Sequence, residues 1–241
     1  DLTILNRGIL CPFYLFKKIM AIPQSYQGVG RNKLIASYWW SVPKTFTKNV
    51  IPMEGGLVIN PANDPGGNTN KGIIWATYAG GGYYVIGNPK PNSQEMAANL
   101  SNDFKNLTDT DVYTIVEKLF FNNEDLPASF GGYRYNLGKI HDESIQMIIL
   151  YSIWGSGYAG QNTVKKMQEW LGVPQDNQLG PQTISAVNAL SFDKKRALAN
   201  YLIEARWEFL QSLWNFSYFP GWIKAVWFLQ DFEAFYSQKK K

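Results

Sequence analysis

The segment from Glu54 to Gly72 constrains the fold more than any other part of this chain. It combines five glycines with two carboxylates, Glu54 and Asp64, and follows a stretch with little other charge. Glycine adopts backbone conformations that are closed to other residues, so a continuous helix is not expected here. The residues that shape this loop are Gly55, Gly56, Gly66, Gly67 and Gly72.

The elements on either side of these glycines can be predicted from local patterns. Residues 46–53 indicate a short helix, which the first glycine pair would end. Residues 60–70 are dense in Asn, Asp, Pro and Gly, which predicts a loop or a tight hairpin. Glu54 is therefore expected at the end of a helix, with Asp64 and Thr69 on the hairpin that follows.

Most of the remaining chain is predicted to be helical. Thr108 suits an N-cap, and apolar residues recur at helical spacing from Val112 onward. Residues 142–154 are apolar nearly all round, which predicts a central buried helix. We therefore expect a mainly α (α+β) protein with a small β hairpin next to Glu54. The predicted helices are 93–104, 108–121, 142–154, 163–171, 183–190, 192–213 and 222–236, and a short strand is predicted over 83–86.

Charge and hydropathy exclude two kinds of partner. The net charge is only +4, which suits an anionic partner such as a cell wall. No sustained Lys/Arg stripe and no basic helix interleaved with aromatic residues occurs, so nucleic acid is not an expected partner. No apolar run reaches the roughly 18 residues that cross a bilayer, so no membrane span is expected. Because the chain begins with Asp1, we expect a processed product or an excised region.

The chain has a single cysteine, Cys11, and a single histidine, His141. One cysteine cannot form an intrachain disulfide, and one of each cannot assemble a His/Cys zinc site. His141 precedes two acidic residues at a predicted helix start, which is more typical of a surface position than of a catalytic pair. We therefore expect no metal and no other cofactor.

Aromatic residues make up 15% of the chain, which is a high fraction. Aromatic rings dominate the burial of apolar surface in protein cores. Flat rings in a cleft can also stack on the faces of sugars. Both alternatives stay open for four rings near the predicted loop and the central helix, namely Trp75, Tyr78, Tyr84 and Trp154.

Two ordered strings of residues resemble a known family. Glu54-Gly-Gly followed by Asn63-Asp-Pro-Gly-Gly-Asn-Thr-Asn-Lys-Gly72 resembles the signature of glycoside hydrolase family 108. That family consists of lysozyme-like N-acetylmuramidases, often phage-type endolysins. A second block, 163–183, resembles the peptidoglycan-binding segment that follows the catalytic segment in such proteins, and Phe219-Pro-Gly-Trp222 matches a Gly-Trp near its end.

The resemblance implies a lysozyme-like bilobed domain. It divides the chain into an N-terminal arm or connector (1–47), a catalytic lysozyme-like segment (48–140) and a helical peptidoglycan-binding-like segment (141–241) that completes the same fold. The order of Glu54, Asp64 and Thr69 is also similar to the Glu/Asp/Thr trio of phage-type lysozymes. In those enzymes, Glu ends a helix while Asp and Thr lie on a hairpin across the cleft.

Hydrolysis of a glycosidic bond requires a proton for the leaving oxygen and stabilisation of an oxocarbenium-like charge. Glu54 is the predicted general acid, because apolar neighbours such as Val50 and Ile51 would favour its protonated form. Asp64 would stay ionised, and either position water or stabilise positive charge, while Thr69 would hold the water. A carboxyl separation of about 5 Å would suit a retaining route and about 6.5–9.5 Å an inverting one.

The predicted function is a peptidoglycan hydrolase that cleaves the β-1,4 bond between N-acetylmuramic acid and N-acetylglucosamine at the bacterial cell envelope. The alternatives are a non-catalytic peptidoglycan-binding or assembly component and a lytic transglycosylase. Residues 1–47 are a candidate connection to a larger virion or secretion assembly, and the protein is expected to be virion-associated or secreted. The predicted substrate-binding residues are Asn70, Trp75, Tyr78, Tyr84 and Trp154.

Overall fold

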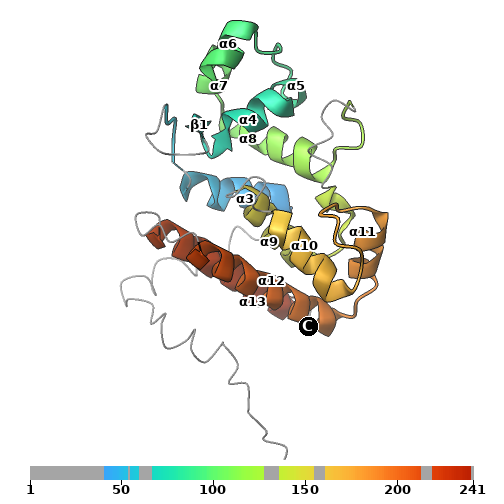
Figure 1. The fold of residues 1–241 in the computed structure, drawn as a ribbon. Helices are drawn as coiled ribbons and strands as arrows, with labels where there is room; N and C mark the ends of the chain where they lie inside the picture. Colours follow the sequence, from blue (N-terminus) through green and yellow to red (C-terminus); the bar gives the residue numbers. More distant parts are fainter. Residues whose placement is uncertain are drawn as a thin grey trace, which may run out of the picture. The chain divides into compact units, whose positions relative to one another are not determined.

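The computed structural model describes residues 41–53, 55–59, 67–127, 136–154, 161–212 and 219–239 (Figure 1). These residues belong to a compact unit that spans Ser37–Lys241. The unit is mainly helical, with one small antiparallel hairpin among the described residues, which confirms the predicted fold class. No helix among the described residues has both the length and the hydropathy of a membrane span.

The central helix is α9 (Glu143–Trp154), as the sequence predicts. It begins where the backbone N–H of Ile145 donates to the Asp142 carboxylate, at 3.0 Å. Nine of its 12 residues are buried. Helices from both ends of the described chain pack on it, including α3 (Val42–Asn49), α10 (Gln161–Leu171), α12 (Phe192–Ser212) and α13 (Phe219–Lys239). An all-round apolar surface requires such covering, because every face must leave water.

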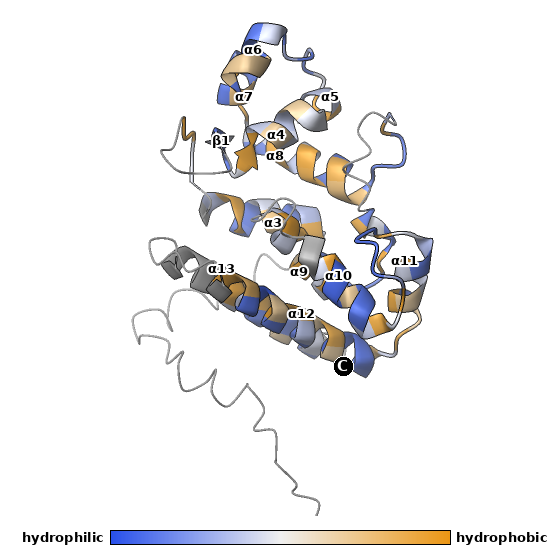
Figure 2. Ribbon diagram, in the orientation of Figure 1, coloured by the Kyte–Doolittle hydropathy of each residue, from blue (hydrophilic) through white to orange (hydrophobic). Residues whose placement is uncertain are grey.

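The C-terminal helices cover α9. Helices α12 and α13 run side by side (Figure 1), and hydrophilic residues alternate with apolar ones along α10 and α12 (Figure 2). Helix α13 begins at Phe219, before the predicted residue 222, and Pro220 lies in its first turn. Proline is tolerated there, since the first N–H groups of a helix have no intrahelical partner. The bounds are α10 (Gln161–Leu171), α11 (Pro181–Asn188), α12 (Phe192–Ser212) and α13 (Phe219–Lys239).

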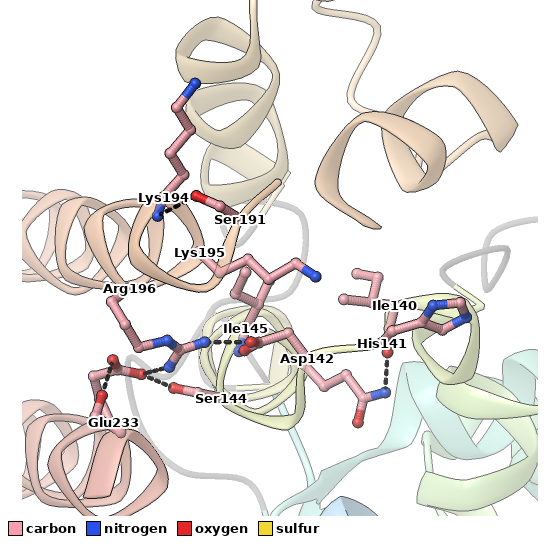
Figure 3. A network of polar contacts seen from close by, with 12 residues as sticks. Ile140, His141, Asp142, Ser144, Ile145, Ser191, Lys194, Lys195, Arg196 and Glu233 are labelled. Atoms are coloured by element: carbon pink, nitrogen blue, oxygen red, sulfur yellow. Dashed lines mark hydrogen bonds and ion pairs between the residues drawn. The ribbon is translucent and has the colours of Figure 1, made fainter. Parts of the chain in front are cut away.

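A buried ionic cluster joins three of these helices (Figure 3). Arg196 of α12 forms ion pairs with Asp142, which precedes α9, and with Glu233 of α13. The hydroxyl of Ser144 also donates to Glu233, and that of Ser237 donates to it at 2.9 Å. Burial raises the pKa of the Glu233 carboxyl, although the Ser144 hydroxyl and the Arg196 charge oppose that shift.

The element before Glu54 is anchored in the core. Helix α3 (Val42–Asn49) begins before the predicted residue 46. Pro43 lies in its first turn, where proline is favoured. A 3₁₀ turn (Ile51–Met53) follows it. Phe46 is fully buried, and its ring lies 5.9 Å from that of Tyr151 and 5.2 Å from that of Trp154.

The small hairpin expected near Glu54 is present, but it lies at residues 69–74, later than the predicted 60–70, most of which lies outside the described residues. Strands β1 (Thr69–Asn70) and β2 (Ile73–Ile74) are antiparallel, with Thr69 opposite Ile74. The two residues between them have positive φ, 49° at Lys71 and 75° at Gly72. That conformation defines a two-residue turn of type I′, which matches the twist of the flanking strands and favours glycine at its second position.

The strand predicted over 83–86 is wrong. The chain continues from β2 through α4 (Trp75–Thr77) and a π-helical turn (Tyr78–Gly82) into α5 (Tyr83–Val85). The wider π-turn brings residues five apart to one face. It places the rings of Tyr78 and Tyr83 6.4 Å apart, and both are buried. Burial of these two rings outweighs the strand propensity of the Tyr-Tyr-Val-Ile run.

The helix predicted over 93–104 is two helices, and Asn92 is the N-cap of the first. The Asn92 side chain accepts from the N–H groups of Gln94 and Glu95, at 3.0 Å each. Asn99, with φ of 51°, ends the first helix. The Ser101 hydroxyl caps the second. The two helices are α6 (Ser93–Ala98) and α7 (Asn102–Lys105).

The predicted helix over 108–121 is confirmed. It consists of α8 (Asp109–Val116) and a π-helical continuation (Glu117–Phe121). Thr108 forms a capping box with Asp111, in which each side chain accepts from the other residue's backbone N–H. A 3₁₀ turn (Leu137–Lys139) then leads to α9. The predicted division of the chain at 47/48 and 140/141 stays a prediction.

Candidate active site

Two residues that shortly precede Glu54 are buried in the core. Val50 is fully buried and Ile51 is 4% exposed. Glu54 itself lies outside the described residues, as do Asp64 and Gly66. Gly55 follows with φ of 86°, a left-handed conformation that disfavours any side chain. The predicted roles of Glu54 and Asp64 stay predictions.

The other predicted loop-shaping glycines differ in their backbone. Gly67 and Gly72 have φ of 68° and 75°, so both occupy conformations that suit glycine. Gly56 has no positive φ, and a Cβ at this position would meet no atom within 4 Å. A side chain at Gly56 is therefore compatible with the described backbone.

Thr69 lies in the middle of a small β structure. Its backbone pairs with Ile74 on one side and with Val58 on the other. The N–H of Val58 donates to Thr69 O at 2.8 Å, and the N–H of Thr69 donates to Val58 O at 3.0 Å. The Thr69 side chain is half-buried. The predicted catalytic threonine is thus paired on both edges, with Val58 from the stretch after Glu54 and with Ile74 of the hairpin.

The two asparagines beside Thr69 are buried and are hydrogen-bonded to helix ends. Asn70 is 3% exposed, and its Nδ2 donates to the carbonyl oxygens of Phe104 at 2.7 Å and Lys105 at 3.0 Å. Asn68 is also 3% exposed, and its Nδ2 donates to Asn99 O at 2.9 Å. A buried amide with these partners does not support the predicted contact between Asn70 and substrate.

Trp75 and Tyr78, both predicted to bind substrate, are core residues. They are 5% and 0% exposed, and both rings pack against Phe104, at 5.4 Å and 5.3 Å. The Tyr78 hydroxyl accepts from Asn88 at 3.1 Å, and burial raises its pKa. Neither ring presents a face to solvent, so burial favours the core alternative for both.

Tyr84 and Trp154 are the predicted aromatic residues that keep exposed surface. Tyr84 is 49% exposed and Trp154 is half-buried. Trp154 ends α9 and packs on Phe46 of α3 and on Phe120, whose ring is 5.9 Å away. Its Nε1 is buried and has no hydrogen-bond partner among the described residues.

A buried side-chain amide holds together the second sequence block, residues 163–183. Gln168 of α10 is fully buried, and its Nε2 donates to Asp176 Oδ1 at 2.7 Å and to Gln178 O at 2.9 Å. Its Oε1 accepts from the N–H of Asn177 at 3.0 Å. The Gln178 N–H and then the Gln168 amide lower the pKa of the Asp176 carboxyl. The Gln168 side chain thus links α10 to the turn at residues 176–178.

We expect Gln168→Leu to destabilise the protein by about 1–3 kcal/mol, because it leaves the buried partners of the amide without hydrogen bonds. Chemical denaturation followed by tryptophan fluorescence measures this loss. Gln182→Leu is the matched control, since Gln182 is exposed and its replacement should leave the midpoint near that of the parent. Equal midpoints for both variants would contradict the role assigned to Gln168.

The anchored helix before Glu54, the hairpin after it and the buried central helix define a mainly α, lysozyme-like protein. Residues 47–129 match the family model of glycosyl hydrolase 108. The resemblance inferred from the first motif, Glu54 to Gly72, is thereby confirmed. The family identifies a glycoside hydrolase and supports a peptidoglycan hydrolase of lysozyme-like type.

The structure is also similar to that of SagA from Brucella abortus. The TM-score is 0.56 and the sequence identity 25%, and the match covers 81% of this chain and 95% of SagA. No match was found among curated proteins. In the parts of the chain that the structure describes, no group of three or more His, Cys, Asp and Glu residues could hold a metal ion.

Proposed function

We propose that this protein is an N-acetylmuramidase, which cleaves the β-1,4 bond between N-acetylmuramic acid and N-acetylglucosamine. The observation that carries this proposal is the family match over 47–129, because that segment contains Glu54, Asp64 and Thr69 in order. The buried α3 and the paired hairpin support it, since they hold the chain on both sides of Glu54.

In the proposed reaction, Glu54 donates its proton to the glycosidic oxygen as the carbon–oxygen bond breaks. Positive charge then develops on the sugar ring. Asp64, as a carboxylate, stabilises that charge or orients the attacking water, and the Thr69 hydroxyl holds the water. The water oxygen bonds to the anomeric carbon, and its proton leaves to a carboxylate.

Substrate contacts beyond these three residues are proposed for two aromatic side chains. Tyr84 has an exposed ring, and Trp154 keeps part of its surface open beside the helix that leads to Glu54. Flat rings such as these can stack on sugar faces. Peptidoglycan is the proposed partner, so the site of action is the bacterial cell envelope. Delivery in a virion or by secretion, with residues 1–47 as the connection, belongs to the same proposal.

Digestion of purified peptidoglycan by the parent protein tests the proposed bond. Mass spectrometry of the soluble products is expected to show muropeptides with a reducing N-acetylmuramic acid, together with a rise in reducing sugar. Anhydro-muropeptides would identify a lytic transglycosylase. Products with reducing N-acetylglucosamine would place cleavage at the other glycosidic bond. Sedimentation with peptidoglycan without any release would identify a binding component.

A further inference from the structure

We propose that Asn68 and Asn70 are positioning residues, which lock the hairpin against α6 and α7 and so orient the Thr69 hydroxyl. This inference rests on the proposed function of Thr69. It assigns Asn70 a role different from substrate binding.

The Asn70 amide has no hydrogen left for a sugar. A side-chain NH₂ carries two hydrogens, and Asn70 Nδ2 has two carbonyl acceptors, Phe104 O and Lys105 O. Both carbonyls lie at the C-terminal end of α7, which is four residues long. The last carbonyls of a helix have no intrahelical partner, so Asn70 satisfies groups that would otherwise be unpaired.

Asn68 acts in the same way on the preceding helix. Its Nδ2 donates to the carbonyl of Asn99, the left-handed residue that ends α6. Its backbone carbonyl accepts from the N–H of Trp75 at 2.9 Å, which continues the hairpin ladder. The two asparagines are two residues apart and both face α6 and α7. Since side chains alternate along an extended strand, Thr69 faces the opposite side.

Further contacts restrain the Thr69 backbone. It is paired with Val58 and with Ile74, so neither edge of its strand is free to shift. The turn residue Lys71 forms an ion pair with Asp109 at 2.6 Å. With the backbone held, the Thr69 hydroxyl moves only by rotation about χ1, which β-branching restricts. A catalytic group held in this way needs little reorganisation in the reaction.

A double-mutant cycle on peptidoglycan hydrolysis tests the inference. Asn70→Ala is expected to lower kcat about 10- to 100-fold with little change in KM, since a small displacement of a reacting group can cost that much. In a Thr69→Val background, the same change should lower kcat no further, because the group that Asn70 positions is already absent. Asn68→Ala should show the same coupling, and it provides a second variant if Asn70→Ala fails to fold.

Other outcomes overturn the inference. A rise in KM with unchanged kcat would make Asn70 a direct substrate ligand, and independent losses in the two backgrounds would make its role purely structural. Parental activity of Thr69→Val would remove Thr69 from the machinery while the proposed function stands. If the parent protein does not hydrolyse peptidoglycan, the proposed function fails. In that case, amide hydrogen exchange tests whether Asn70 holds the hairpin in place. Unchanged protection of the Thr69 and Ile74 amides in Asn70→Ala would refute this role.

Discussion

Replacing Glu54 with Gln is expected to lower the rate of peptidoglycan hydrolysis by about 10²–10⁴-fold, the contribution typical of a general acid. The amide keeps the size of the carboxylic acid but has no proton to give to the leaving oxygen. Binding should survive, because the rest of the predicted site is unchanged. Turbidity loss of a peptidoglycan suspension measures the rate, and sedimentation with the same suspension measures the binding.

The matched control for this substitution is Glu169→Gln. Glu169 is an exposed residue of α10, where it pairs with Lys166 at 2.9 Å. The same change of charge there should leave both clearing and sedimentation at the level of the parent. If Glu54→Gln clears the suspension as fast as the parent, Glu54 is not the acid.

Replacing Arg196 with Met is expected to lower the free energy of unfolding by about 3–5 kcal/mol at pH 7. Arg196 is the cation of the buried cluster in Figure 3, and its removal leaves Asp142 and Glu233 as buried carboxylates without a counter-charge. Arg196 also stacks on the ring of Tyr236, with its guanidinium carbon 4.7 Å from the ring centroid. Chemical denaturation followed by circular dichroism measures the change.

The loss should be smaller in acid. Burial raises the pKa of Glu233 above its ordinary 4.5, and Arg196 opposes that rise, so the variant raises this pKa further. A folded-state pKa above the unfolded value favours folding below about 4.5, and this contribution is lost as pH rises through the folded pKa. The deficit of the variant is therefore expected to shrink between pH 7 and pH 4.5.

Two further variants separate charge from packing in this cluster. Adding Glu233→Gln to Arg196→Met should recover part of the stability, because it removes one uncompensated buried charge. Lys166→Met, which removes an exposed cation from α10, should leave stability near that of the parent. An equal loss at both pH values, with no recovery in the double variant, would assign the effect to lost packing on Tyr236.

Local patterns were sufficient for much of the helical framework. The capping box at Thr108 and the all-round apolar run of α9 both predict elements that the structure contains. Each depends on neighbours within a few turns, so no tertiary information is needed. The strand predicted over 83–86 failed because Tyr83 packs against Tyr78, and a π-turn places those rings together. Similarly, α13 begins before the predicted residue 222, because proline is tolerated in the first turn of a helix.

The sequence by itself determined the family resemblance, most of the long helices and the string in which Glu54, Asp64 and Thr69 occur. These are properties of residues close together in the chain. Only the tertiary structure decided how the neighbouring polar and aromatic residues divide among core, anchor and exposed surface. Tyr78 is buried, Asn70 caps a helix 34 residues away, and Tyr84 stays exposed. Whether a side chain is buried or exposed depends on which faces meet when distant elements pack. The local spacing of residues does not determine this.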